Sequence, residues 1–317
     1  MKLTTNIAIN KVTHNTISYN SKLLLIGSCF SENIGNKLAY FKFQSKQNPF
    51  GILFHPKAIE NFITKAINEE RYTEKDIFFH NERYHSFDAH SSLSSSSKDE
   101  LLNNLNTNIE LTHELLKTSS HIIITLGTAW VYREIASDIL VANCHKIPQK
   151  KFLKELLSID EILESLEAIQ SLVKSINSNI SILYTVSPVR HIKDGFVENQ
   201  RSKAHLLSAI HQVIEPRKNI FYFPSYEIMM DELRDYRFYA EDMIHPNQTA
   251  INYIWEKFTD TWFSESNFET MKTVDTIQKG LTHRPFNPDS EAHQLFLEKL
   301  HTKKETLLQA FPFMNFT

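Results

Sequence analysis

Residues 22–31 read KLLLIGSCFS, an apolar run that ends in a glycine followed by small polar side chains. The apolar part, 23–26, has the length and composition of a buried β-strand. Gly27 suits a tight turn, and the residues after it predict a helix that begins near Ser31. A strand that turns directly into a helix is the first half of a βα unit, so this stretch predicts an α/β fold.

Further strands and helices alternate along the chain in the same way. Three other short runs have the β-branched or aromatic content of strands and lie at 121–126, 180–186 and 219–223. Helical patterns between them begin at Pro56, after Ser158 and near Asn247. Because parallel neighbours need crossover connections of this length, we expect a three-layer α/β/α sandwich with a mainly parallel sheet.

Composition narrows the class of protein. The 317 residues are 41% hydrophobic and 22% charged, as in a globular protein, and a serine-rich stretch at 90–97 predicts a surface loop. The pattern divides the chain into a main domain at 1–264 and a helical extension at 265–317 that packs on it. A net charge of -3 argues against a nucleic-acid partner. The absence of a signal-like start or of a long apolar run predicts a cytoplasmic protein with no membrane span.

Chemically interesting residues follow the predicted strands immediately. They are GSCF at 27–30, GTAW at 127–130 and SPVRH at 187–191. The carboxyl ends of parallel strands meet at one edge of a sheet, where ligands bind in α/β folds. These clusters are therefore expected to share one site.

A nucleophile and its base can be chosen from these residues. Ser28 lies in the turn before a helix, where free backbone N–H groups stabilise negative charge. Asp242 precedes His245 by three residues, and a carboxylate can orient such a histidine as a general base. Ser28 could instead merely cap the helix, and Cys29 is the alternative nucleophile, which we rank below Ser28.

Together these segments resemble the SGNH (GDSL-like) hydrolase superfamily and, more closely, the GSCFA family. GSCFS at 27–31 is similar to the signature that gives the GSCFA family its name, with Ser31 in place of the usual alanine. Further resemblance lies in NPFG at 48–51, LGTAW at 126–130, NCHK at 143–146, SPVRH at 187–191 and DMIHPN at 242–247. The resemblance covers roughly residues 20–260. It implies a flavodoxin-like sheet, with Ser28 as nucleophile, Asp242 as orienting acid and His245 as base.

The resemblance also implies an oxyanion hole, the set of donors that stabilises negative charge on the reacting oxygen. Ser28 and Gly51 would supply backbone N–H groups. The asparagine that the superfamily usually contributes is missing, because Ala129 stands in its place. We expect Asn48 to replace it, with Thr128 among the alternatives.

Five other residues are candidates for substrate binding: Trp130, Asn143, His145, Arg190 and His191. Arg190 could bind a carboxylate or phosphate, or could pair with Glu198 or Asp194. His80, His85 and His90 have a spacing that suits neither a helix face nor a strand face, so we expect no metal and no cofactor.

The sequence thus predicts a serine esterase that acts through an acyl-enzyme on a small-molecule or glycan ester, for example as a carbohydrate deacetylase. An acyltransferase that passes the acyl group to a glycan is the nearest alternative. From a different class, a weakly catalytic carbohydrate- or acyl-binding homologue is compatible with Ala129.

Overall fold

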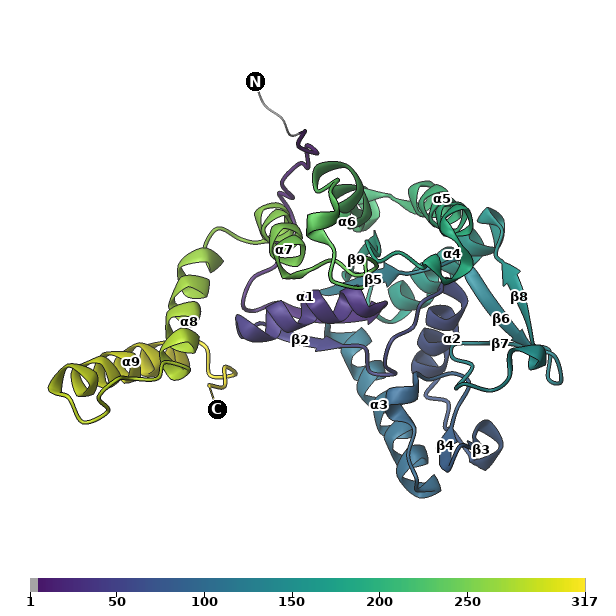
Figure 1. Ribbon diagram of the computed structural model, residues 1–317, viewed down its shortest axis with the longest axis horizontal. Coiled ribbons are helices and arrows are strands. Elements are labelled where there is room, and N and C mark those ends of the chain that lie inside the picture. Colours follow the sequence, from purple (N-terminus) through teal and green to yellow (C-terminus); the bar gives the residue numbers. More distant parts are fainter. Residues whose placement is uncertain (1–4, 317) are drawn as a thin grey trace.

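The computed structural model describes residues 5–316 and contains a central sheet of five parallel strands (Figure 1). These strands are β1 (Lys22–Gly27), β2 (Gln44–Gln47), β5 (His121–Leu126), β9 (Ser181–Val186) and β10 (Ile220–Phe223). They lie in the order β10-β9-β5-β1-β2. Counted in chain order within the sheet, this is the 2-1-3-4-5 order of flavodoxin-like folds. The expected α/β class and parallel sheet are confirmed.

The central strands are buried on both faces, as their continuous apolar composition requires. Alternate side chains enter two different cores, because successive residues of a strand point to opposite faces. In β1, Leu24 and Ile26 belong to one core, whereas Leu23 and Leu25 belong to the other.

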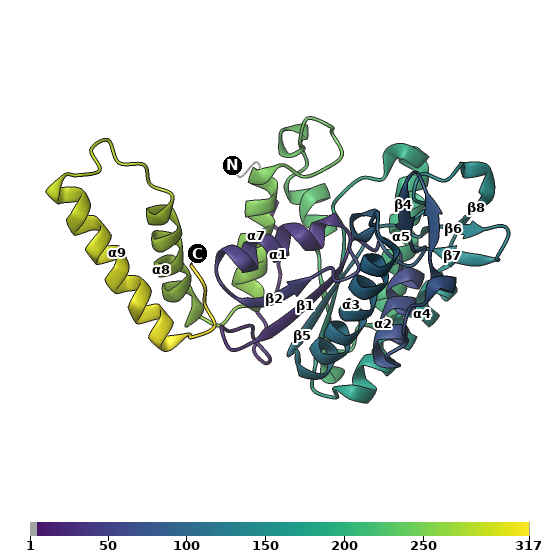
Figure 2. The same ribbon diagram turned by 90° about the horizontal axis from the view of Figure 1, so that it is seen from below.

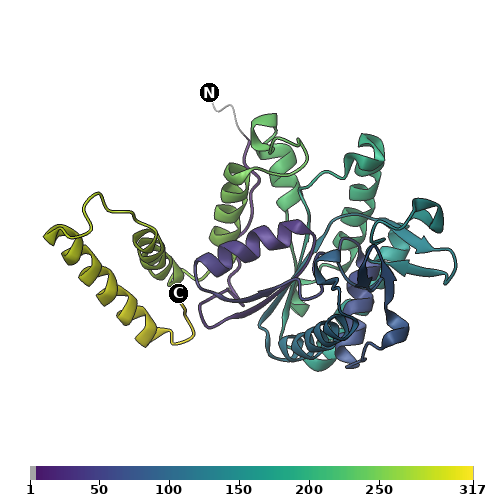
Figure 3. The same cartoon turned by 60° about the horizontal axis from the view of Figure 1, so that its bottom comes forward.

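Helices cover both faces of the sheet and form the outer layers (Figures 2 and 3). The helices of the first core are α2 (Pro56–Ile67), α3 (Lys98–Thr118), α4 (Ile159–Ile176) and α5 (Phe196–Val213). Those of the second core are α1 (Cys29–Tyr40), α7 (Gln248–Trp262), the π-helical turn η6 (Ile228–Glu232) and the C-terminal helices α8 (Asn267–Leu281) and α9 (Glu291–Ala310). The short α6 (Ser225–Glu227) precedes η6, and its Tyr226 enters the first core. The described residues therefore form the predicted three-layer arrangement.

Local capping residues set the helix starts. Ser158 and Glu161 form the capping box of α4, Pro56 is the first residue of α2, and Asn247 caps α7. The helix expected near Ser31 begins two residues earlier, at Cys29, because the Ser28 side chain already accepts a helical N–H.

Several short elements were not predicted. β2 is polar (QSKQ) and lies at the sheet edge, so it lacks the apolar signal of a buried strand. Two small antiparallel sheets contain β3 (Phe78–His80) with β4 (Arg83–His85), and β6 (Trp130–Glu134) with β7 (Ile139–Val141) and β8 (Phe152–Leu156). Single turns of 3-10 helix lie at Glu74–Asp76, Ser91–Leu93, Gln149–Lys151, Ile192–Asp194, Pro216–Lys218 and Tyr236–Phe238.

Two helices, α8 (Asn267–Leu281) and α9 (Glu291–Ala310), form the expected C-terminal addition. They lie side by side at one end of the molecule, beyond the β2 edge of the sheet (Figures 1 and 2). Tyr40 of α1 donates to Asp275 of α8 at 2.8 Å, which ties the addition to the main body. The division at residue 264 stays a prediction. No helix in the 5–316 range has the length and apolar character needed to cross a membrane.

Candidate active site

The turn after β1 and the turn after β5 lie side by side at the carboxyl edge of the sheet. β1 and β5 are paired in parallel, with Gly27 opposite Thr125. Strand order reverses at this pair, since β1 leads outward to β2 and β5 leads to β9 on the other side. Such a reversal is where flavodoxin-like folds bind their ligands, so GSCF at 27–30 occupies the expected place for a site.

Ser28 lies in this turn, and its polar groups are engaged in starting α1. Its side-chain oxygen accepts the Phe30 N–H at 3.3 Å, and its own N–H donates to Thr125 O at 3.0 Å. The residue is only 1% exposed. In this conformation Ser28 acts as the N-cap of α1, and its N–H is already paired.

Cys29, the next residue, is partly exposed and is the first residue of α1. Burial, followed by the negative charge of Glu32, raises the pKa of its thiol. The N–H groups of Cys29 and Phe30 and the positive charge of Lys203 act in the opposite direction. The thiol is therefore protonated at neutral pH, at a position where several donors favour the thiolate.

Asp242 and His245 form the pair that their spacing predicts. Asp242 Oδ2 lies 2.6 Å from His245 Nδ1, and Asp242 Oδ1 accepts the N–H groups of Ile244 at 2.9 Å and His245 at 3.0 Å. These hydrogen bonds, first the one from the His245 N–H, lower the Asp242 pKa to about 2. With Nδ1 facing an ionised carboxylate, Nε2 is the nitrogen left to act as base.

Arg190 holds the loop that carries this pair. Its guanidinium donates to Met243 O, its N–H donates to Ile244 O at 3.2 Å, and it stacks over the Tyr239 ring at 4.0 Å. Met243 has a positive φ of 57°, so this loop takes up a conformation that its sequence alone does not favour. Arg190 is therefore a positioning residue in this structure.

The carboxylates that we considered as partners of Arg190 pair with other cations. Glu198 lies 2.9 Å from Arg201, and Asp194 pairs with Lys154. Arg190 Nε is buried and has no hydrogen-bond partner among the described residues.

Lys203 of α5 is a part of the site that the sequence did not reveal. It is 1% exposed, and its Nζ donates to Gly127 O and Ser187 O, each at 2.7 Å. These carbonyls follow β5 and β9, so the lysine joins two strand ends beneath the site. Burial lowers its pKa to about 7, whereas Cys29 acts to raise it. A lysine within an amphipathic helix usually faces solvent, and no local signal marks this one.

His191 is close enough to both Lys203 and His245 for their charges to act on it. Burial, and then the positive charges of Lys203 and His245, lower its pKa to about 3. Its Nε2 is buried without a hydrogen-bond partner within residues 5–316. A neutral imidazole with one unpaired nitrogen can accept from, or donate to, a bound substrate.

Like the Ser28 N–H, two further predicted oxyanion donors already have acceptors. The Gly51 N–H donates to Asn48 O at 2.8 Å, and the Thr128 N–H donates to Phe54 O at 3.1 Å. The Thr128 hydroxyl lies 3.0 Å from the Ser202 hydroxyl. Both residues shape the loops around the site. Their N–H groups already donate within the protein and so are not free to act as oxyanion donors in this conformation.

Asn48 is different, because one of its amide groups is unpaired. Its Oδ1 accepts the Gly27 N–H at 2.9 Å, which places the side chain against the turn that leads to Cys29. The residue is 9% exposed, and its Nδ2 has no partner among the residues that the structure describes. A buried, unpaired N–H₂ group is what an oxyanion hole requires of a donor.

A cavity of about 470 Å³ adjoins the site and is lined by four of the predicted residues, namely Thr128, Trp130, Asn143 and His191. The Trp130 indole donates to Glu198 O at 3.2 Å, and the Lys154 ammonium lies 4.5 Å from the centre of its ring. The cavity therefore offers a fixed aromatic face together with amide and imidazole groups. Lys146, Lys193 and Asp194 also line the cavity, so the mixture suits a polar ligand.

His145 is not among the residues that line this cavity. It is 4% exposed, and its ring nitrogens lie 2.7 Å from Ser86 O and 3.0 Å from the Ser91 hydroxyl. Burial lowers its pKa to about 4. Its observed contacts are those of a structural histidine.

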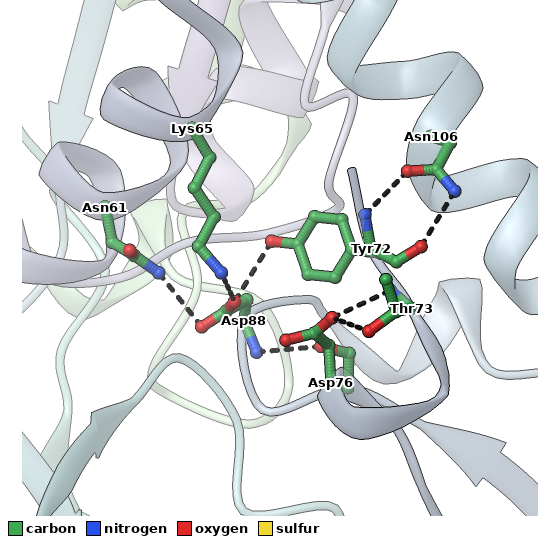
Figure 4. Close-up of polar contacts among 8 residues, drawn as sticks. Asn61, Lys65, Tyr72, Thr73, Asp76, Asp88 and Asn106 are labelled. Carbon is green, nitrogen blue, oxygen red and sulfur yellow. Dashed lines mark hydrogen bonds and ion pairs between the residues drawn. The ribbon is translucent and has the colours of Figure 1, made fainter. Parts of the chain in front are cut away.

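A second polar cluster lies away from the site, around Asp88 (Figure 4). The Asp88 carboxylate accepts hydrogen bonds from Asn61 at 2.9 Å, Lys65 at 2.8 Å and the Tyr72 hydroxyl at 3.0 Å. The Asn106 side chain fixes Tyr72 in turn, because its Oδ1 accepts the Tyr72 N–H and its Nδ2 donates to Tyr72 O. Asn61 and Lys65 belong to α2, and Asn106 belongs to α3. The cluster therefore ties these two helices to the loop at 86–88.

Comparison with known protein families identifies the family of the chain. The model of the GSCFA family matches residues 22–258, and that of the GSCFA domain protein, C-terminal domain, matches residues 274–317. No curated protein matches the chain. The first match spans most of the sequence and includes the turn at 27–30, Asn48 and the Asp242–His245 pair. The chain therefore belongs to the GSCFA family.

Proposed function

We propose that this protein transfers an acyl group from an ester, using a nucleophile in the Ser28–Cys29 turn and His245 as general base. The observation that carries the proposal is the Asp242–His245 pair, in which a 2.6 Å contact between Oδ2 and Nδ1 leaves Nε2 as the base. Arg190, which follows β9, holds the loop of this pair at the carboxyl edge of the sheet, where Asn48 Nδ2 is a buried donor with no partner among the described residues. A base, a donor and a nucleophilic turn are the components of acyl transfer.

The reaction that we propose passes through an acyl-enzyme. His245 Nε2 takes the proton of the nucleophile, which attacks the carbonyl carbon and forms a tetrahedral intermediate. Asn48 Nδ2 donates to the oxyanion, and the ionised Asp242 stabilises the imidazolium. His245 then gives its proton to the leaving alcohol. Water repeats the sequence on the acyl-enzyme and releases the acid.

We also propose that the fold is a variant of the SGNH (GDSL-like) hydrolase fold and that the chain is an esterase. The 2-1-3-4-5 sheet order, the turn after the first strand and the Asp-x-x-His segment before α7 support this assignment. The substrate that we favour is a small acylated carbohydrate, because the adjoining cavity has an aromatic face at Trp130 and an amide at Asn143.

The test is hydrolysis of p-nitrophenyl acetate and of acetylated sugars by the purified chain, with more than one turnover required. His245→Ala should lower kcat by roughly 100- to 10,000-fold, as expected for loss of a general base. His301→Ala, which alters an exposed histidine of α9, is the matched control and should leave turnover unchanged. Equal turnover by native protein and His245→Ala would refute the proposal.

A further inference from the structure

We propose that Cys29, rather than Ser28, is the nucleophile, so that the acyl-enzyme is a thioester. This inference rests on the proposed function and specifies its reacting atom. It replaces the Ser28 assignment that the sequence favoured.

The first argument is the position of Ser28. Its side-chain oxygen accepts the Phe30 N–H, and the residue is 1% exposed. To attack a substrate, this hydroxyl would have to leave the start of α1, which would remove the N-cap of that helix. Its N–H also points to Thr125 O rather than to a free site.

The second argument is the position of Cys29. It is the first residue of α1 and is partly exposed, and the N–H groups of Cys29 and Phe30 act to lower the pKa of its thiol. Lys203 adds a positive charge from the strand ends below. Backbone N–H groups at a helix N-terminus and a nearby cation both stabilise a thiolate.

The third argument is independent of the cysteine. Asn48 packs on the same turn through its hydrogen bond to Gly27 and keeps a buried Nδ2 with no partner in the described chain. An unpaired buried donor costs free energy unless a ligand uses it. A carbonyl oxygen bound beside Cys29 would satisfy this donor close to the positive end of the α1 dipole.

The chemistry balances without any further reactant. The Cys29 S–H gives its proton to His245 Nε2, the sulfur bonds to the carbonyl carbon, and the C–O bond to the alcohol breaks. The alcohol leaves with the proton from His245. Water, or a hydroxyl of an acceptor, then attacks the thioester and regenerates the thiol. Because burial raises the Cys29 pKa, this step needs the base that His245 provides.

The experiment identifies the acylated atom directly. Native protein is mixed with p-nitrophenyl acetate, quenched in acid after milliseconds to seconds, and weighed intact with and without neutral hydroxylamine, which cleaves thioesters but spares ordinary oxygen esters. We expect one acetyl adduct that hydroxylamine removes, located by fragmentation on the peptide that contains residues 28 and 29. This measurement needs no variant and so does not depend on whether a variant folds.

Variants of Ser28 and Cys29 then test which of the two residues is the nucleophile. Cys29→Ala should lose the adduct and lower turnover on the order of 1,000-fold or more, as for removal of a nucleophile. Ser28→Ala should still form the adduct on Cys29. Cys144→Ser is the matched control, since it removes the other thiol of the chain and should still give a hydroxylamine-labile adduct.

The outcomes distinguish this inference from the proposed function. A hydroxylamine-resistant adduct that is lost in Ser28→Ala would make Ser28 the nucleophile, and acyl transfer would stand while the inference fell. An adduct on Cys144 would overturn the inference in the same way. Absence of both adduct and turnover in the folded native protein would overturn the proposed function itself.

Discussion

The buried Lys203 leads to a prediction that can be worked out quantitatively. Its pKa is lowered to about 7 by burial, whereas an unfolded chain has an ordinary lysine value of about 10.4. Between these values the unfolded state binds more protons than the folded state, so the free energy of unfolding must rise with pH. Loss of the proton costs no hydrogen bond, because a neutral amine still has two hydrogens for Gly127 O and Ser187 O.

The magnitude follows from the two values. Folded Lys203 is half charged at pH 7 and almost neutral at pH 9, while the unfolded chain stays mostly charged over this range. A difference of one bound proton between the two states changes the free energy of unfolding by about 1.4 kcal/mol per pH unit. Lys203 should therefore raise the free energy of unfolding by about 2 kcal/mol between pH 7 and pH 9. Lys203→Met removes the titration, so the difference between native protein and variant should grow by that amount.

Urea unfolding at pH 7, 8 and 9 measures this difference, and groups that titrate in both proteins cancel from it. The variant should also be less stable at each pH, because two buried carbonyls lose their donor at about 1 to 3 kcal/mol each. Lys299→Met, at an exposed lysine of α9, is the matched control and should show no difference that grows with pH. A difference between native protein and Lys203→Met that stays constant or shrinks with pH would refute the reasoning.

Three further predictions concern the site and its loops. Asp242→Asn should lower kcat by roughly 100- to 10,000-fold in a steady-state assay, and an unchanged kcat would contradict its role. In the native protein the Asp242 pKa is about 2, so the carboxylate should stay ionised and should stop orienting His245 only as the pH falls toward that value. Asn48→Asp keeps the acceptor for the Gly27 N–H but loses Nδ2, so kcat should fall by about 100- to 1,000-fold with a smaller change in KM. A large change in KM with an unchanged kcat would argue against an oxyanion role. Gly51→Ala should lower the urea midpoint, because a Cβ there would lie 2.5 Å from the His90 Cβ at a φ of +71°; equal midpoints would show that the loop relaxes.

The elements that could be predicted are those in which neighbours along the chain decide the structure. The buried strands at 121–126 and 180–186 are apolar throughout, and the capping box at Ser158 acts over three residues. The Asp242–His245 pair is of the same kind, since its partners are three positions apart and share one turn. The edge strand β2 escaped prediction because its stability comes from pairing with β1 rather than from its own polar sequence.

The sequence by itself determined the parallel α/β architecture, the turn at 27–30 and the acid–histidine pair, because hydrophobic periodicity and short-range hydrogen bonds are properties of adjacent residues. Only the tertiary structure decided that Ser28 is more buried than Cys29, that Asn48 Nδ2 has no partner among residues 5–316, and that Lys203 lies beneath the site. These facts depend on contacts between distant segments, such as the hydrogen bond from Lys203 to Gly127 across 76 residues. A side chain's solvation and charge environment are set by what packs around it, and chain folding brings those groups together from positions that no local pattern relates.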